Sequence, residues 1–198
     1  MPSISSGYII GYHGCDKEHG LRLINGTDEL RPSNNSWDLL GAGIYFWEDH
    51  PVRALQYSVE TSSGSQKNQA AAATPFVVGA VIDLGKCLNL VEVESLAILT
   101  EAFQGLTTLS NMGEQPMPHN RGKNRALDCA VINFVHQSNK ENGIIAYDSV
   151  RCAFAEGDPA FPGSQITERL HIQLCVRNSE LIKGYFLPKP PVQFNPYL

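Results

Sequence analysis

Tyr12-His13-Gly14 opens a pattern that continues with Gly41-Ala-Gly-Ile-Tyr45-Phe46 and ends with Tyr57, and this pattern decides how the fold and the function are interpreted. The glycines let other groups approach the backbone closely, because they carry no side chain. The tyrosine rings offer flat apolar faces with a polar end, and the histidine offers a ring that can donate or accept hydrogen bonds. Together these residue types predict a site for a flat, polar, ribose-bearing ligand that needs neither a metal nor a phosphate-binding loop.

The local sequence predicts two strands and a helix that carry these residues. Residues 7–13 form an apolar run that is typical of a strand, with His13 at its end before a glycine turn. Residues 44–47 predict a second short strand. Pro51 then marks the start of a helix, because a proline in the first helical turn loses no hydrogen bond. We expect Tyr57 near the C-terminal end of this helix.

The rest of the chain alternates short apolar runs with stretches rich in glycine, proline and polar residues. Residues 76–84 form a β-branched run that predicts a central strand, and residues 125–140 carry the clearest apolar stripe of a helix. Residues 170–177 alternate apolar and polar side chains, which is typical of a strand with one covered face. The remaining expectations are a short helix or turn at 20–30, a helix at 93–103, strands at 144–147 and 181–186, loops at 31–36, 105–123 and 155–164, and an extended tail from Pro188.

Short strands separated by irregular stretches, together with three helices, predict an α+β fold. A parallel dinucleotide-binding sheet is disfavoured, because Gly41-Ala-Gly lacks the third glycine and the following helix of that fingerprint. The length of 198 residues suits a single domain over 1–198 with its core at about 7–188. Residues 61–74, rich in serine and alanine, predict a flexible surface loop.

Composition and charge exclude several classes of protein. The net charge of −5 argues against a broad basic surface for nucleic acid. The five cysteines are scattered, with no Cys-x-x-Cys pair and no His/Cys spacing of a zinc site, so we expect reduced thiols and no metal. The N-terminus lacks the basic region of a signal peptide, and no stretch approaches the roughly 20 apolar residues of a membrane span. We therefore expect a cytoplasmic protein that does not associate with membranes.

The pattern at residues 12–57 resembles the NAD-binding half of the ADP-ribosyltransferase family, in the branch of diphtheria toxin and the poly(ADP-ribose) polymerases. That family has His-Gly-Ser/Thr, then Gly-x-Gly-Ile-Tyr-Phe, then a helix that ends in tyrosine. The resemblance implies a split antiparallel β-sheet with a few peripheral helices, and NAD as a substrate. It also implies cleavage of the bond between nicotinamide and ribose through an oxocarbenium-like state, in which a neutral nicotinamide leaves without a general acid.

The resemblance carries over residue by residue. His13 matches the histidine that holds the adenosine ribose, and Gly14 matches the glycine whose backbone grips the nicotinamide carboxamide. Cys15 stands where serine or threonine is usual, which removes one hydroxyl contact. Tyr45 and Tyr57 match two tyrosines of the ligand-binding pocket. The NAD-binding residues implied in this way are His13, Gly14, Cys15, Gly43, Tyr45 and Tyr57.

A late strand supplies the third element of the family pattern. Gln173-Leu-Cys-Val-Arg-Asn178 matches the phrase that carries a glutamate in polymerising members, so glutamine stands here in its place. Glutamine can accept a hydrogen bond from a ribose hydroxyl, but it carries no charge and cannot act as a base. The departure therefore favours single transfer over chain elongation. Glu156, in the preceding loop, is assigned a role as base or target-recognition residue, with Asp158 the weaker candidate. The implied catalytic set is Gln173, Glu156 and Tyr45.

We therefore expect a mono-ADP-ribosyltransferase that passes ADP-ribose from NAD to a macromolecular acceptor, either protein or nucleic acid. Small stand-alone proteins of this kind resemble toxins or defence effectors. An inactive module that binds NAD or ADP-ribose is the first alternative, because Gln173 lacks a charge, and an NAD glycohydrolase shares the same site. A thiol-dependent hydrolase is a further alternative, although no nucleophile motif surrounds its candidate residues. Those candidates are Cys15 or Cys152 with His13 or His171.

Overall fold

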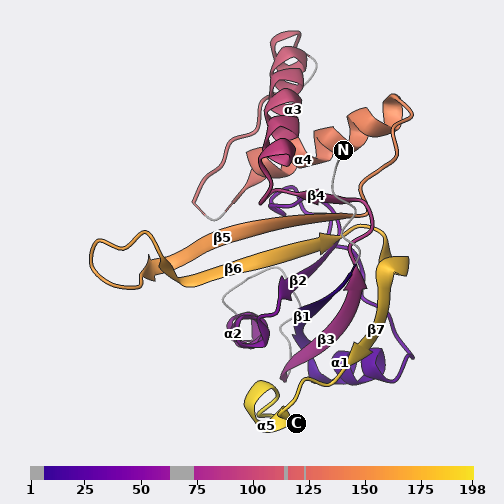
Figure 1. Cartoon of the computed structure of the whole chain (residues 1–198), viewed down its shortest axis with the longest axis vertical. Helices are drawn as coiled ribbons and strands as arrows, with labels where there is room; N and C mark the ends of the chain where they lie inside the picture. Colours follow the sequence, from indigo (N-terminus) through magenta and orange to yellow (C-terminus); the bar gives the residue numbers. More distant parts are fainter. Residues whose placement is uncertain (1–6, 63–73, 114–115, 123) are drawn as a thin grey trace.

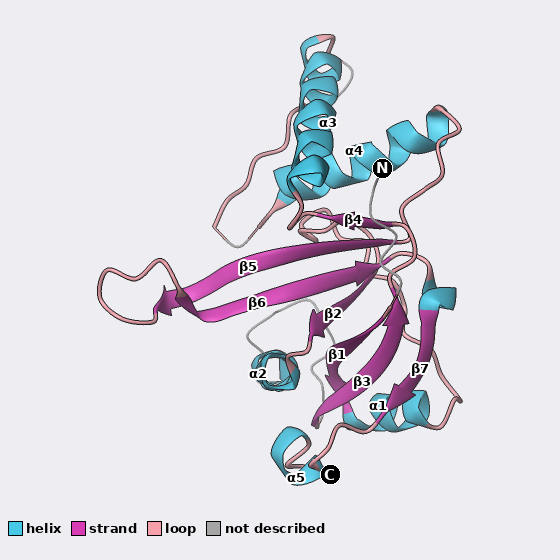
Figure 2. Cartoon of the chain, viewed as in Figure 1, coloured by secondary structure: helices cyan, strands magenta, loops and turns pink. Residues whose placement is uncertain are grey.

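A computed structural model of the chain describes residues 7–62, 74–113, 116–122 and 124–198. These residues form an α+β fold with one seven-stranded sheet and five α-helices (Figure 1 and Figure 2). The strands are β1 (Tyr8–Asp16), β2 (Ile44–Glu48), β3 (Pro75–Asp83), β4 (Cys87–Asn89), β5 (Ser149–Pro159), β6 (Thr167–Val176) and β7 (Ile182–Phe186). The helices are α1 (Lys17–Ile24), α2 (Pro51–Ser62), α3 (Val93–Asn111), α4 (Ala126–Glu141) and α5 (Pro191–Phe194), and a 3-10 turn covers Ser179–Leu181.

The sheet has the order β4-β5-β6-β2-β1-β3-β7, and every neighbouring pair is antiparallel except β4 with β5. The helices α3 and α4 lie beyond its β4 end, whereas α1 and α5 lie near its β3 and β7 end (Figure 1). Helix α2 packs against β1 and β3. β5 and β6 form a long hairpin that reaches away from the rest of the sheet (Figure 2).

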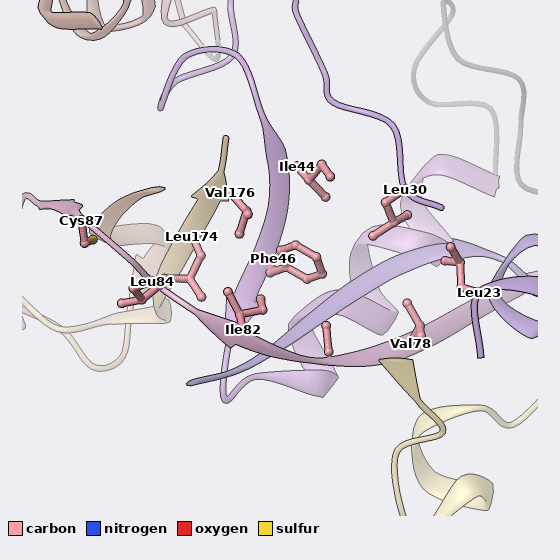
Figure 3. Close-up of a cluster of buried hydrophobic side chains, with 11 residues drawn as sticks. Leu23, Leu30, Ile44, Phe46, Val78, Ile82, Leu84, Cys87, Leu174 and Val176 are labelled. Carbon is pink, nitrogen blue, oxygen red and sulfur yellow. The ribbon is translucent and has the colours of Figure 1, made fainter. Parts of the chain in front are cut away.

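Three clusters of buried apolar side chains hold these layers together. The first joins α1 to the centre of the sheet and includes Phe46 and Val78 (Figure 3). The second packs α4 on the β4–β5 end, with Ile132 and Val150 in its interior. The third lies under α2 and includes Trp47. The sheet is therefore covered along most of its length, and the outer half of the β5–β6 hairpin is the part that projects.

The short strand β2 is the point where the sheet opens. Residues 44–47 of β2 pair with β6, whereas only its last two residues pair with β1, opposite Tyr12 and Gly11. β1 continues beyond Tyr12 to Asp16 and stays paired with β3 over its whole length. β1 and β2 therefore diverge after Tyr12, and the edge of β1 that faces β2 borders an opening.

Most of the predicted strands and helices are confirmed. The structure has the short strand at 44–47, the helix that starts at Pro51, the central strand at 76–84 and the helix at 125–140, each with ends within two residues of those expected. The two late strands are present as β6 and β7. The α+β class follows directly from these elements.

Three other predictions are wrong. Gly14 does not open a turn, because β1 keeps its ladder with β3 through Asp16. Residues 144–147 do not form a strand. The first half of the predicted loop at 155–164 belongs to β5, because the ladder with β6 continues past Gly157 by means of a register shift between Glu156 and Pro159.

Further differences lie in α3, in the tail and in β4. Helix α3 runs through Gly105 to Asn111. Gly105 does not end the helix but makes room for α4, because a Cβ there would lie 2.7 Å from the ring of Phe134. The tail contains α5, and the side chain of Asn195 docks it on β3 by bonding the N–H and C=O of Val77 at 2.7 and 3.0 Å. The strand β4 is too short to predict from its sequence. The expected loop at 61–74 begins within α2, and its residues 63–73 lie outside the described part of the chain.

Candidate functional site

The opening between β1 and β2 forms a pocket of about 950 Å³. Its walls come from the C-terminal half of β1, from β2, from the loop at 31–39, from α1 and α2, and from β6. Seven residues that the sequence singled out line this pocket: His13, Gly14, Cys15, Gly43, Tyr45, Tyr57 and Gln173. The structure therefore brings the predicted ligand-binding residues together, whereas Glu156 is not among those that line the pocket.

His13 bridges the two diverging strands. Its Nδ1 lies 2.8 Å from the carbonyl oxygen of Tyr45, and a carbonyl oxygen can only accept, so Nδ1 carries the hydrogen and Nε2 is the acceptor of the ring. Burial lowers the pKa of His13, and the hydrogen bond to Tyr45 offsets that effect only in part. The imidazole is therefore neutral at pH 7 and can offer Nε2 to a hydroxyl of a ligand.

The peptide groups of Gly14 point to the edge of β1 that borders the pocket. Alternate residues of a strand direct their backbone N–H and C=O to the same edge, and the carbonyl of Ile10 accepts from the N–H of Asp49 on the β2 side at 3.0 Å. Gly14 shares this edge with Ile10. Val77 of β3, which lies opposite Gly14, forms its backbone hydrogen bonds with the side chain of Asn195 at the other edge of β3. The backbone groups of Gly14 and Val77 therefore point away from each other, those of Gly14 toward the pocket. A backbone donor and acceptor side by side suit a primary carboxamide.

The glycine turn before β2 is held by Tyr45. Its hydroxyl donates to the carbonyl of Gly41 at 2.6 Å and accepts from the N–H of Leu40 at 3.0 Å. Burial raises the pKa of Tyr45, so the hydroxyl stays protonated and engaged in the turn while the ring lines the pocket. Gly43 is needed for a different reason, because a Cβ there would lie 2.5 Å from the sulfur of Cys175 on β6.

Tyr57 and Trp47 form an aromatic wall. Their ring centroids lie 5.0 Å apart at an interplanar angle of 48°. Both residues line the pocket, Tyr57 from α2 and Trp47 from β2. The guanidinium of Arg53 lies 5.6 Å from the centroid of Trp47, which is within the range of a cation–π contact.

Gln173 lies at the base of the long hairpin, opposite Trp47 on one side and Cys152 on the other. Its Nε2 lies 3.1 Å from Nε2 of His171. His171 is only 5% exposed, whereas Leu170 beside it is 52% exposed. The sequence predicts buried apolar and exposed polar side chains on this strand, and at these two positions the structure has the reverse. The outer half of β6 pairs with β5 alone, and Arg53 of α2 approaches the face of the hairpin that carries His171.

Glu156 lies on the same face of the hairpin as Gln173 but further out. It pairs with Arg169 across the ladder, four positions along β5 from the residue opposite Gln173, which is roughly 13 Å at the usual rise of a strand. Its Oε2 accepts from Arg53 at 3.1 Å. Arg53 is only 7% exposed, so this ion pair ties α2 to the hairpin. Asp158 lies beyond Glu156 on the exposed end of the same strand.

The thiols are poorly suited to nucleophilic catalysis. Burial, together with the carboxylate of Asp16, raises the pKa of Cys15 to about 12. Burial also raises the pKa of Cys152. A thiol with a raised pKa is protonated at pH 7 and is a weak nucleophile. This electrostatic environment disfavours the thiol-dependent hydrolase.

The loop at 31–39 contributes pocket residues that the sequence did not single out. Arg31 and Trp37 line the pocket, and Trp37 is 47% exposed. The loop is shaped by Asp38, whose Oδ2 accepts from the hydroxyl of Ser33 at 2.6 Å and from the N–H of Asn35 at 2.7 Å. A lone tryptophan in a loop rich in serine and asparagine is the one sequence signal that could have pointed to this wall.

In the part of the chain that the structure describes, His, Cys, Asp and Glu side chains form no group of three or more that could hold a metal ion. The described helices include none that is both long and apolar enough to cross a bilayer.

Comparisons with protein-family models, with curated proteins and with solved structures found no match.

Proposed function

We propose that this protein binds NAD in the pocket between β1 and β2 and transfers ADP-ribose to a macromolecular acceptor with release of nicotinamide. The convergence of seven predicted residues on one pocket carries this proposal, since Gln173 is distant in sequence from the other six. The pocket volume of about 950 Å³ falls within the roughly 300–1,000 Å³ of small-molecule sites. The opening of the sheet at β2 corresponds, in this proposal, to the split sheet of ADP-ribosyltransferases.

The polarity of the pocket supports one orientation of NAD. The nicotinamide ring stacks between Tyr45 and Tyr57, with its carboxamide on the backbone of Gly14. The adenosine ribose lies at Nε2 of His13. Loop 31–39 covers the remainder of the ligand: a guanidinium at Arg31 suits the diphosphate, and the exposed ring of Trp37 suits the adenine.

The proposed reaction breaks one bond and forms one. The bond between C1′ of the ribose and the ring nitrogen of nicotinamide breaks, and nicotinamide keeps the electron pair and leaves as a neutral molecule. A nucleophilic atom of the acceptor bonds to C1′ and releases its proton to solvent or to a carboxylate. The oxygen of the Gln173 amide accepts from a ribose hydroxyl, which orients the sugar and stabilises the developing positive charge. Because the amide is uncharged, this stabilisation is weaker than that from a carboxylate, and single transfer is favoured over elongation.

Glu156 fits the acceptor side of the site in this proposal. Its distance along the hairpin from Gln173 keeps it away from the scissile bond, and its ion pair with Arg53 fixes its position. A carboxylate in that place can receive the proton of an acceptor or contact the acceptor directly. Protease or nuclease treatment of the labelled product distinguishes a protein acceptor from a nucleic acid.

The test measures nicotinamide release and acceptor labelling. The full chain is incubated with NAD labelled in its phosphates, with and without cell lysate, and the products are treated with protease or nuclease. Trp37→Ala should raise the KM for NAD about tenfold, because an aromatic stack on a base contributes roughly 1–3 kcal/mol. Phe161→Ala is the matched control, since Phe161 is an exposed aromatic residue at the hairpin end, outside the pocket. Equal behaviour of the two variants, or the absence of NAD binding, would contradict the proposal.

A binding module without turnover is the second candidate. The observation in its favour is the uncharged side chain of Gln173 at the position where the resemblance places the glutamate of polymerising ADP-ribosyltransferases. NAD binding without nicotinamide release in any lysate, unchanged by Gln173→Glu, would identify the module. Nicotinamide release that needs no macromolecule would instead identify a glycohydrolase.

A further inference from the structure

The hydrogen bonds of His171 have only one consistent direction. Its Nδ1 lies 2.6 Å from the carbonyl oxygen of Arg169, which can only accept, so Nδ1 is the donor. In a neutral ring Nε2 is then an acceptor. The group 3.1 Å from this Nε2 must therefore donate, which assigns the NH2 end of the Gln173 amide to His171. The carbonyl oxygen Oε1 is left as the end that can accept in the pocket.

We propose that His171 is a positioning residue that holds the amide of Gln173 with its oxygen turned toward the ligand. This rests on the proposed function, because the ligand hydroxyl that Oε1 meets is the ribose hydroxyl of NAD. A glutamine amide has two ends of nearly equal size and opposite hydrogen-bonding character. The reversed orientation would place a donor where the developing cation needs an electron-rich atom. A glutamate needs no such partner, since its two oxygens are equivalent.

The surroundings keep His171 neutral. It is buried, and the ring of Phe154 on β5 lies 5.8 Å away, centroid to centroid. Burial lowers the pKa of His171, and the charged or titratable groups around it are Glu156 on β5, which raises the pKa, and Arg53 and His50 on the α2 side, which lower it. The imidazole is thus a hydrogen-bond acceptor at Nε2 throughout the neutral range.

Protonation of His171 would reverse the pair. Both ring nitrogens are donors in the imidazolium, so Nε2 could no longer accept from the amide. Gln173 would then turn its oxygen toward His171 and its nitrogen toward the ribose. Nicotinamide release should therefore fall at acid pH as His171 takes up a proton, at a pH below the usual histidine pKa of about 6.5.

Two substitutions separate the two nitrogens of His171. In His171→Asn the side-chain amide can still donate to the carbonyl of Arg169, but nothing accepts from Gln173. In His171→Gln the longer side chain can place its oxygen near the former Nε2 and accept from Gln173. We expect His171→Asn to lower kcat for nicotinamide release about tenfold, the worth of one hydrogen bond to the reacting sugar, with little change in KM. His171→Gln should lose less, and the part of the acid limb that comes from His171 should be absent from its pH profile, while the part that comes from protonation of His13 stays.

A second pair of measurements isolates the orientation of the amide. In the Gln173→Glu background His171→Asn should lower kcat by less than twofold, since a carboxylate has no wrong orientation. Phe154→Leu, which alters the packing around His171 and leaves its hydrogen bonds in place, serves as the structural control. A tenfold loss in both backgrounds, or a loss in Phe154→Leu equal to that in His171→Asn, would overturn the proposal.

The side-chain amide signals of Gln173 provide a readout that does not depend on catalysis. In NMR spectra of the ligand-free protein these signals should move with the titration of His171 and lose this dependence in His171→Asn. Coupling without any NAD chemistry would leave the positioning role standing and refute the proposed function. NAD chemistry without this coupling would refute the positioning role alone.

Discussion

At the residue scale, backbone carbonyls orient the polar side chains of the site. The carbonyls of Tyr45 and Arg169 each face Nδ1 of a histidine, at 2.8 and 2.6 Å, and the carbonyl of Gly41 accepts from the hydroxyl of Tyr45 at 2.6 Å. A carbonyl oxygen has no hydrogen to give, so each of these contacts fixes which atom of the side chain donates. The remaining nitrogen of each imidazole is then an acceptor, which is what hydroxyl and amide partners require.

The two nitrogens of His13 can be tested separately. His13→Asn keeps a donor to the carbonyl of Tyr45 and removes the acceptor at Nε2, so we expect NAD affinity to fall about tenfold while stability changes by less than about 1 kcal/mol. His13→Gln has the opposite effect, because its longer side chain reaches the Nε2 position and abandons Tyr45. It should be the less stable of the two in urea unfolding. Calorimetric titration with NAD checks the first expectation, and unchanged affinity in His13→Asn would remove His13 from the site.

The sequence identifies pocket residues by their chemistry and misses those whose role depends on burial. His13, Tyr45 and Tyr57 stand out because their types and spacing form a recognisable set. His171 looks like an outward-facing member of an alternating strand, and only the approach of α2 to the hairpin buries it. Arg53 is hidden for the same reason, since nothing in a helical sequence indicates that an arginine will be 7% exposed.

At the element scale, α2 docks on β1 where a glycine allows it. A Cβ at Gly14 would collide with the carbonyl oxygen of Ala54 and would lie 3.1 Å from Cβ of Ser58. Gly14→Ala should therefore displace α2 and cost about 1–3 kcal/mol of stability. Gly184→Ala in β7 is the matched control, because a Cβ there meets nothing within 4 Å, and it should change stability by less than about 0.5 kcal/mol. Thermal unfolding of the two variants compares them, and equal midpoints would show that α2 does not depend on this contact.

The ion pair between α2 and the hairpin is asymmetric, because Arg53 is buried and Glu156 is 43% exposed at its side chain. Glu156→Ala leaves a buried guanidinium whose remaining carboxylate partner among the described residues is Glu60, at 4.0 Å, and should cost about 1–3 kcal/mol. Arg53→Met leaves a carboxylate that water can reach and an apolar chain on Trp47, so it should cost less than about 1 kcal/mol. Denaturant unfolding gives both values. The reverse order would mean that packing of the arginine, and not its charge, holds α2 to the hairpin.

Element boundaries are predictable where periodicity is strong and fail where glycine has a packing role. Gly105 and Gly157 both suggested irregular structure, yet one lies inside α3 and the other inside β5. The first makes room for Phe134 of the neighbouring helix, and the second allows a bulge at a positive φ of 81°. Both functions depend on a second element, and a local sequence pattern does not contain that element.

At the scale of the whole molecule, the pocket exists because β2 is shared between two halves of the sheet. The hydrophobic patterns of β1, β2 and β6 predict three strands but not their order, so neither the divergence of β1 from β2 nor the contact of Gln173 with this opening could be derived from periodicity. The order of the motifs led to the same grouping only through the resemblance to a known family. The five-residue strand β2 provides many of the pocket residues because it pairs with β6 along its length and with β1 only at its end.

The stability of the whole molecule should depend on pH through His136 on α4. This residue is 8% exposed, both ring nitrogens are buried without a hydrogen-bond partner among the described residues, and Tyr147 packs on the ring. Burial, with a smaller contribution from Arg177, lowers the pKa of His136 to about 4. Between these two pKa values the unfolded chain, with a histidine pKa near 6.5, binds a proton that the folded chain does not bind. The contribution of His136 to stability is therefore fully present above about pH 6.5 and is lost as the pH falls toward 4.

This loss can be measured against a variant that cannot titrate. Between pH 7 and pH 5 the contribution of His136 amounts to about 2 kcal/mol, from 1.36 kcal/mol per pH unit below the unfolded pKa. His13 and His171 also have lowered pKa values and act in the same direction, but they are present in both proteins. In urea unfolding, His136→Phe should therefore lose about 2 kcal/mol less of its free energy of unfolding than the parent protein over this interval. The phenylalanine ring can still pack on Tyr147. Parallel pH profiles of the two proteins would show that the imidazole gains a proton, or a partner, without unfolding α4.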